Sequence, residues 1–404
     1  MIAGLLALLP AAGDADQPPV EVGLDRVQAG EVSLPREVRA GLVAHAASIT
    51  ADGRHAIDVL RESGVNVVRL FAPEHGLRSR AAAGEQLIDG RDSRSGLPVI
   101  SLYGESRKPT PEQLADLDLL VFDLQGAGVR FYTYVSTLIL TLEATADAGL
   151  ELIVLDRPNP LGGDRIEGPV SAPRELVAAS FVNMAPGPLV HGLTLGEMAR
   201  YVNRRRAEPA RLRVIPMRGW RRSMLWADTG REWVPPSPNL RTPVAALAYP
   251  GVALLEATNV SEGRGTESPF LLFGAPWFEP ARSGLTAGGS PLAGFRLHPA
   301  EFRPMVGEAA LRPKYADERC KGFQVRVFDA GKTEGYRLGL ELVSALSRQE
   351  GFAWRRNGEA LTWLLGTPTV YRALAAGRPV AEILAADTAD HERWRSERRS
   401  ALLY

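Results

Sequence analysis

The sequence predicts an α/β protein that begins with a Rossmann-like parallel sheet. Apolar runs rich in β-branched residues alternate with helical patterns between residues 38 and 155, and this alternation is typical of βαβ units with right-handed crossovers. The chain has 404 residues, which is long for one core and favours two domains. Its composition, 45% hydrophobic and 23% charged, is that of a soluble globular protein.

Five apolar segments are expected to form the strands of this sheet. They span residues 38–45, 65–71, 97–103, 118–124 and 151–155. The second of these runs is stopped by Pro73 and Gly76, residues that commonly end a strand. A polar stretch at 78–96 then follows, which is too long for a simple connection and is therefore a candidate active-site loop.

Helices are expected between these strands, with recognisable start and stop signals. They cover residues 55–63, a segment starting at 110, and residues 132–148 and 193–206. Thr110 before Pro111 is a typical helix start, and Gly149 is a typical C-cap. Thr194 and Glu197 have the spacing of a capping box.

The second half of the chain mixes strands and helices after a stiff proline-rich segment at 235–238. We place the domain junction near residues 235–250, which gives a Rossmann-like domain over 25–240 and a C-terminal domain over 245–404. Further elements are expected as a strand at 322–328, helices at 334–347 and 358–365, and a terminal helix from about residue 380.

The first 20 residues allow two interpretations. Residues 1–10 are apolar and are followed by small residues, as in a secretory signal, but no positive charge precedes Ile2. The segment is either a signal peptide shortened by a misplaced start codon or a disordered tail. The first interpretation predicts a secreted or periplasmic protein, and the second predicts a cytoplasmic one. No later segment has the apolar length of a membrane span.

Several function classes lack their sequence signatures. Neither G-x-G-x-x-G after the first strand nor a P-loop is present, and the histidines show no H-E-x-x-H spacing. No serine lies in G-x-S-x-G. Lys plus Arg equals Asp plus Glu at 47 each, which argues against general nucleic-acid binding. We therefore expect no cofactor, no metal and no nucleic-acid partner, and the oligomeric state stays open.

Polar side chains follow three of the expected strands and form the first group of candidate site residues. These are Glu74 and His75 after the second strand, Gln125, Arg130 and Tyr132 after the fourth, and Asp156 and Asn159 after the fifth. If the sheet is parallel, all three strand ends lie at one edge, where ligands bind in open α/β sheets. Asp156 has an alternative role, because aspartates at turns often anchor loop amides.

A second group of candidates lies beyond the junction. Asn239 follows the proline-rich segment, and a loop at 259–270 carries Glu262, Arg264 and Glu267 between glycines. On composition alone, an ordinary loop is an equally good interpretation of this segment.

Six motifs, in order along the chain, resemble a known family. They are Pro73-Glu74-His75-Gly76, the segments 130–134 and 156–160, Ser237-Pro238-Asn239, and the segments 262–266 and 274–277. From about residue 38 to the C-terminus the chain resembles the bacterial exo-β-N-acetylmuramidases, once a domain of unknown function. Members release N-acetylmuramic acid (MurNAc) from the non-reducing end of peptidoglycan fragments.

The resemblance implies a Rossmann-like N-terminal domain, a smaller C-terminal α/β domain and a cleft between them. It makes Glu74 the leading catalytic candidate and implies muropeptides or MurNAc-GlcNAc as substrates. Two positions depart from the family pattern: Gly126 stands where an acid usually follows the glutamine, and Ser79 replaces a glycine. The first departure puts the rate or the substrate in doubt.

Glycoside hydrolysis usually requires one carboxyl group as acid and a second as base or nucleophile. Glu74 would hold its proton if the cleft partly removes it from water, and His75 would orient it or bind substrate. For the second carboxylate the sequence offers Glu262, Glu267 and Asp156 without a choice, and a substrate-assisted route through the acetamido group would need none.

The lactyl carboxylate of MurNAc requires a cation, for which Arg130 and Arg264 are candidates. Two rival functions stay open. A non-catalytic muropeptide-binding or sugar-binding protein would use the same cleft without an acid. Another Rossmann-like hydrolase or transferase on a phosphorylated sugar would need phosphate affinity, which the missing glycine-rich loop disfavours.

Overall fold

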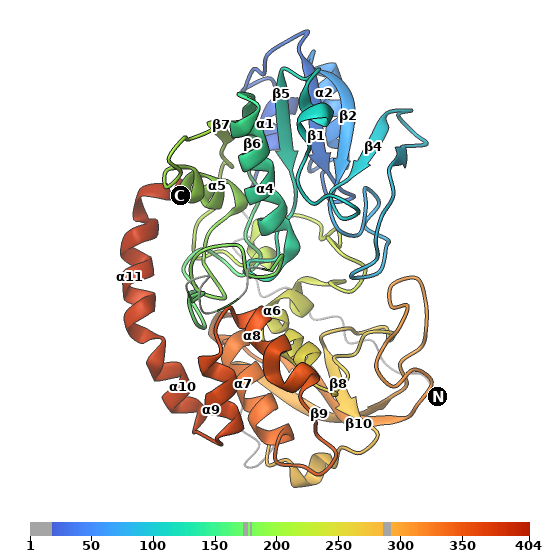
Figure 1. Ribbon diagram of the computed structural model, residues 1–404, viewed down its shortest axis with the longest axis vertical. Helices are drawn as coiled ribbons and strands as arrows, with labels where there is room; N and C mark the ends of the chain where they lie inside the picture. The colour runs from blue at the N-terminus through green and yellow to red at the C-terminus, as the bar shows by residue number, and fades with distance from the viewer. Residues whose placement is uncertain (1–17, 173–176, 178–179, 286–291) are drawn as a thin grey trace.

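The computed structural model describes residues 18–172, 177, 180–285 and 292–404. Residues 1–17, which hold most of the predicted signal or tail, lie outside this range. Figure 1 shows two lobes, a larger sheet-containing lobe at the top and a second lobe below it. Among the described residues, no helix is long and apolar enough to cross a membrane.

The first lobe is built on a seven-stranded sheet in the order β3-β4-β2-β1-β5-β6-β7. The strands are β1 Arg39–Ala44, β2 Asn66–Ala72, β3 Gly90–Arg91, β4 Pro98–Ser101, β5 Leu119–Asp123, β6 Glu151–Leu155 and β7 Arg211–Ile215. All neighbours are parallel except β3, which runs antiparallel to β4. The predicted α/β fold with a parallel sheet is confirmed.

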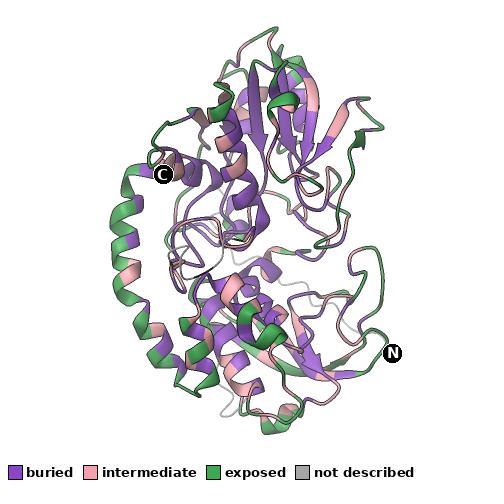
Figure 2. Ribbon diagram, viewed as in Figure 1, coloured by how far each residue is buried: buried purple, intermediate pink, exposed green. Residues whose placement is uncertain are grey.

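Helices cover both faces of this sheet, as Figure 1 shows. They are α1 Gly23–Gln28, α2 Ala56–Glu62, α3 Pro111–Leu114, α4 Thr133–Asp147 and α5 Leu195–Asn203. One apolar cluster joins the sheet to α4 and α5, and a second cluster joins its other face to α1 and α2. A parallel sheet covered on both faces has nearly continuous apolar strands, and every residue of β5 is buried (Figure 2).

The second lobe contains a three-stranded antiparallel sheet in the order β8-β10-β9, with β8 Leu272–Ala275, β9 Phe295–Phe302 and β10 Cys320–Val327. Its helices are α6 Pro243–Val252, α7 Gly335–Leu346, α8 Glu359–Leu365, α9 Thr369–Ala375 and α10 Val380–Ala386. Helices α6 and α7 touch through glycines. A Cβ atom at Gly251 would lie 2.0 Å from the Gly335 carbonyl oxygen, so this crossing requires a residue without a side chain.

The terminal helix is interrupted at Asp387, after which α11 Thr388–Arg398 runs along the outside of both lobes to the first one. Trp394 Nε1 donates to the His191 carbonyl at 2.8 Å, and the Leu403 amide donates to Glu197 at 2.9 Å. The hydroxyl of the last residue, Tyr404, donates to Asp156 at 2.7 Å. The C-terminus is thus fastened to the sheet of the first lobe.

Asp387 should make stability depend on pH. Burial, and secondly the charge of Asp390, raise the pKa of Asp387 to about 7, while Arg130 opposes the shift. An aspartate in the unfolded chain titrates near about 4. The folded state therefore binds the proton more tightly, and the stability that this proton contributes is lost as pH rises from about 4 to about 7.

We predict that Asp387→Asn flattens this part of the profile of unfolding free energy against pH. Urea unfolding at several pH values would measure it, with Asp317→Asn, whose side chain is 77% exposed, as the control. Parallel profiles for wild type and Asp387→Asn would contradict the prediction.

Candidate active site

Glu74 follows strand β2 at the carboxyl edge of the sheet, and its carboxylate is held on both sides. The residue is 7% exposed. Its Oε1 accepts a hydrogen bond from the Gly84 amide at 2.8 Å, and its Oε2 accepts one from the Thr133 hydroxyl at 2.8 Å. One donor comes from the loop after β2 and the other from the first residue of α4, so the plane of the carboxylate is fixed.

Tyr134 holds the main chain of the same glutamate. Its hydroxyl lies 2.7 Å from the Pro236 carbonyl oxygen and 3.2 Å from the Glu74 carbonyl oxygen. Burial, and secondly the charge of Glu74, raise the pKa of Tyr134 far above its usual value, so the hydroxyl keeps its proton. Tyr132 packs edge-on against Tyr134, with ring centroids 4.8 Å apart. The predicted strand-end residues Glu74 and Tyr132 therefore do meet at one edge.

His75 turns the chain away from the strand. Its φ of 71° lies in the left-handed region, which is uncommon outside glycine and recurs at functional sites. Its Nδ1 lies 2.8 Å from the Ala81 carbonyl oxygen, so Nδ1 carries the hydrogen. Burial lowers the pKa of His75 although Glu74 opposes this shift. The ring is thus neutral, with Nε2 as an acceptor.

Two further strands bring polar groups to this edge. Tyr103 follows β4, and burial together with the charge of Glu74 raises its pKa to about 12, so it is a neutral hydroxyl beside the carboxylate. His45 follows β1 and accepts a hydrogen bond from the Gln125 amide at 2.9 Å. The Gln125 side chain donates to the carbonyls of Gly126 and Pro158. Gln125 therefore joins the ends of neighbouring strands.

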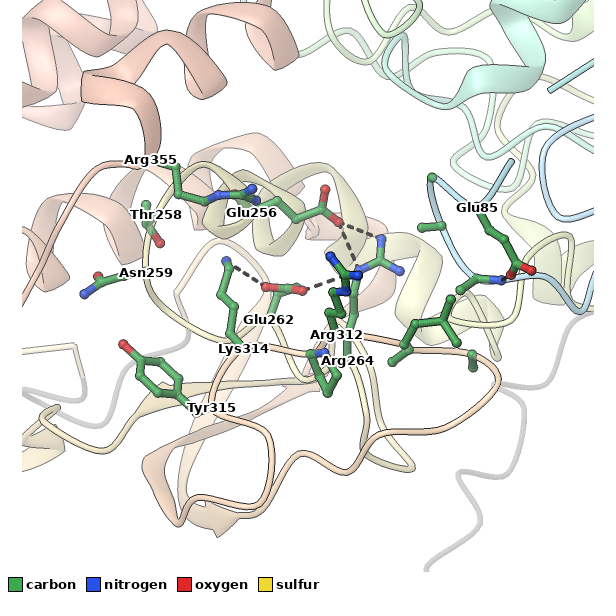
Figure 3. A pocket seen from close by; sticks show the side chains of 17 residues that line it. Glu85, Glu256, Thr258, Asn259, Glu262, Arg264, Arg312, Lys314, Tyr315 and Arg355 are labelled. Atoms are coloured by element: carbon green, nitrogen blue, oxygen red, sulfur yellow. Dashed lines mark hydrogen bonds and ion pairs between the residues drawn. The ribbon is translucent and has the colours of Figure 1, made fainter. Parts of the chain in front are cut away.

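A pocket of about 780 Å³ lies between the loop of Gly84 and the second lobe (Figure 3). It is lined by 82–85 from the first lobe and by residues of three second-lobe segments, 256–264, 309–315 and Arg355. Gly84 lies in its wall, and the amide of Gly84 contacts Glu74. The Glu74 carboxylate therefore lies directly behind Gly84, a residue of the pocket wall.

Charged side chains dominate the second-lobe wall. Glu262 lies between Lys314 Nζ at 3.0 Å and Arg264 Nε at 3.4 Å, and Arg264 also pairs with Glu256 at 2.7 Å, as Figure 3 shows. Burial alone would raise the pKa of Glu262, but the charges of Lys314 and Arg264 outweigh it and lower that pKa. Glu262 is therefore ionised at neutral pH.

The cations of this wall differ in their free donors. Lys314 is saturated, because its ammonium also donates to the carbonyls of Leu255 and Val260. Within the described ranges, Arg355 makes one hydrogen bond, to the Glu256 carbonyl at 3.1 Å. The structure records no hydrogen bond or ion pair for the exposed Arg312 within the described part of the chain. Arg312 and Arg355 therefore keep donors for an anionic ligand.

The described residues hold no group of three or more His, Cys, Asp or Glu side chains placed to bind a metal ion.

Comparison with known proteins identifies the family. The chain matches the model for the N-terminal part of exo-beta-N-acetylmuramidase NamZ over residues 40–244, and the model for the C-terminal part over residues 247–404. The chain belongs to the NamZ family. The predicted membership of a glycosidase family is therefore confirmed.

Individual relatives agree with this assignment. The chain is 35% identical over 393 residues to the peptidoglycan beta-N-acetylmuramidase NamZ of Bacillus subtilis (strain 168), covering 96% of this chain and 92% of the relative. A crystal structure of a DUF1343 family protein from Bacteroides fragilis NCTC 9343 superposes with a TM-score of 0.83 at 30% identity, covering 96% and 99% of the two chains. A second such protein from that organism gives 0.77 at 28% identity with the same coverage.

Arg130 lies in a NamZ-like motif but does not reach the pocket. It is fully buried, and its guanidinium donates to the main-chain carbonyls of Pro169, Gly187 and Leu365. Burial lowers the pKa of Arg130 to about 10. Since Leu365 belongs to the second lobe, Arg130 joins the lobes, and our expectation that it binds substrate is corrected to a structural role.

Asp156 and Asn159 are likewise engaged inside the first lobe. Asp156 accepts hydrogen bonds from the Thr194 hydroxyl and the Gly196 amide at the start of α5, which is the loop-anchoring alternative. Asn159 donates to the Leu193 carbonyl and accepts from the Leu161 amide, both at 3.0 Å. Neither residue lines the pocket.

The candidate site residues of the second group lie in different places. Glu262 and Arg264 line the pocket. Glu267 is exposed and lines a neighbouring hollow of about 800 Å³. Asn239 donates to the Ala309 carbonyl at 2.7 Å and thereby supports the pocket wall. The family-specific position Gly126 faces Leu195, since a Cβ atom there would lie 3.3 Å from that side chain.

We predict that Arg130→Lys destabilises the fold by roughly 2–4 kcal/mol, because one ammonium cannot replace a buried guanidinium that serves three carbonyls. Thermal or urea unfolding would measure the loss. The Michaelis constant of the folded fraction should not change, since Arg130 is away from the pocket. A variant with wild-type stability and a raised Michaelis constant would restore Arg130 to the substrate site.

Proposed function

We propose that this chain hydrolyses peptidoglycan fragments and releases MurNAc from their non-reducing ends, with Glu74 as the general acid. The observation that carries the proposal is the position of Glu74, a buried carboxyl group at the carboxyl edge of the sheet, one residue behind a pocket wall. The names of the family and of the Bacillus subtilis relative support the substrate class.

The acid step requires a proton on the glycosidic oxygen while positive charge develops on the sugar ring. Thr133 holds Oε2 of Glu74, and the Gly84 amide in the pocket wall holds Oε1. We infer that Oε1 faces the substrate once the sugar displaces this amide. The neutral hydroxyl of Tyr103 and the Nε2 acceptor of His75 are then available to hold sugar hydroxyls.

Glu262 is the best of the three candidates for the second carboxylate. Asp156 is bound within the first lobe, and Glu267 lies in the neighbouring hollow. Glu262 lines the pocket and is held ionised by Lys314 and Arg264. A fixed negative charge there would stabilise the positive sugar ring or activate water.

The spare donors of Arg312 and Arg355 fit a carboxylate-bearing substrate. MurNAc differs from N-acetylglucosamine by its lactyl carboxylate, which an arginine can bind through two parallel hydrogen bonds. We propose these two arginines for this role in place of Arg130. Arg264 is less suited, because Glu256 and Glu262 already occupy it.

We predict that Glu74→Gln keeps the fold and lowers turnover of MurNAc-GlcNAc by about 10²–10⁴-fold, because an amide has no acidic proton to transfer. Mass spectrometry of released MurNAc would measure turnover, with the surface variant Glu112→Gln as the control for the same substitution. Wild-type turnover in Glu74→Gln would remove Glu74 from the mechanism. Binding of the disaccharide without any product from the wild-type protein would favour the sugar-binding alternative.

A further inference from the structure

The first turn of α4 contains a threonine hydroxyl that does not cap the helix. Thr133 is the first residue of α4, and its side chain points to Glu74 rather than capping the helix. The hydrogen bond of 2.8 Å is buried, with both residues 7% exposed. The Thr133 hydroxyl therefore hydrogen-bonds to the Glu74 carboxylate instead of capping the helix.

The two donors to Glu74 come from very different surroundings. Gly84 belongs to the loop that forms the pocket wall, and an added Cβ atom there would meet nothing within 4 Å, so this position faces open space. Thr133 begins a helix of 15 residues, of which 11 are buried. Of the two donors, Gly84 is therefore the one beside the pocket, and Thr133 is the one fixed in the packed first lobe.

Tyr134, the residue after Thr133, also holds Glu74. The Tyr134 hydroxyl lies within hydrogen-bonding distance of the Glu74 carbonyl oxygen, so consecutive helix residues hold the side chain and the main chain of one glutamate. Without the Thr133 hydroxyl, Oε2 loses the donor that α4 supplies. The carboxyl group can then rotate about its last torsion, which is intrinsically soft.

We propose that Thr133 is a positioning residue that keeps the Glu74 carboxyl group in the orientation needed for proton transfer. This inference rests on the proposed function. It predicts an effect on the chemical step rather than on substrate binding, because the Thr133 hydroxyl contacts Glu74 and does not line the pocket. Misplacement of a reacting group by about 1 Å is enough to slow a reaction by about 10²-fold.

The test compares Thr133→Val, which removes the hydroxyl, with Thr133→Ser, which keeps it. We expect kcat for MurNAc-GlcNAc to fall by about 10–10²-fold in Thr133→Val with KM within about twofold of wild type. Thr133→Ser should recover most of the loss. If Thr133→Val does not fold, Thr133→Ala takes its place in the same comparison.

Thr141→Val is the matched control. Thr141 lies two turns further along α4 and is fully buried, and its hydroxyl has no hydrogen-bond partner among the residues that the structure describes. The same substitution there should therefore leave kcat unchanged. The inference is overturned if Thr133→Val keeps wild-type kcat, or if Thr133→Ser is as slow as Thr133→Val. A wild-type protein that releases no MurNAc would overturn the proposed function itself, and this inference with it.

Discussion

The start of helix α4 provides the constraint on which the site depends. Thr133 and Tyr134 contact the side chain and the main chain of Glu74, and the Tyr134 hydroxyl also reaches Pro236 in the segment that leads to the second lobe. Since β2 and β5 lie on either side of β1, the residues that follow them meet at the same edge. The position of Glu74 therefore depends on the order of the strands, on the start of α4 and on the segment that leads to the second lobe.

Much of the first lobe could be predicted from the sequence because its strands are buried on both faces. Continuous apolar runs such as β5 can be recognised in the sequence as buried strands. Strand β7 lies at the sheet edge and alternates Arg211 and Arg213 with apolar residues, so it lacks that signal and was not predicted. Strand β9, also at an edge, contains Pro299, a residue that argues against a strand in the absence of pairing information.

The site was predictable only where one local motif carries it. Glu74 and His75 emerge together from a strand end, and that pattern is visible in the sequence. Thr133 and Tyr103 were missed because their contacts with Glu74 join segments distant in the chain. Gly84 was missed because its contact is made by a main-chain amide. Arg130 was assigned to the substrate because sequence does not reveal that three carbonyl oxygens surround its guanidinium.

The course of α11 has a mechanical consequence. The polypeptide leaves the first lobe once, before α6, and returns to it through α11 and the Tyr404 anchor. The buried hydrogen bond from Arg130 to the Leu365 carbonyl adds a further link, so the lobes are held together at more than two places. Ligands of different length would therefore have to be accommodated by the wall loops of the pocket and not by free rotation of one lobe against the other.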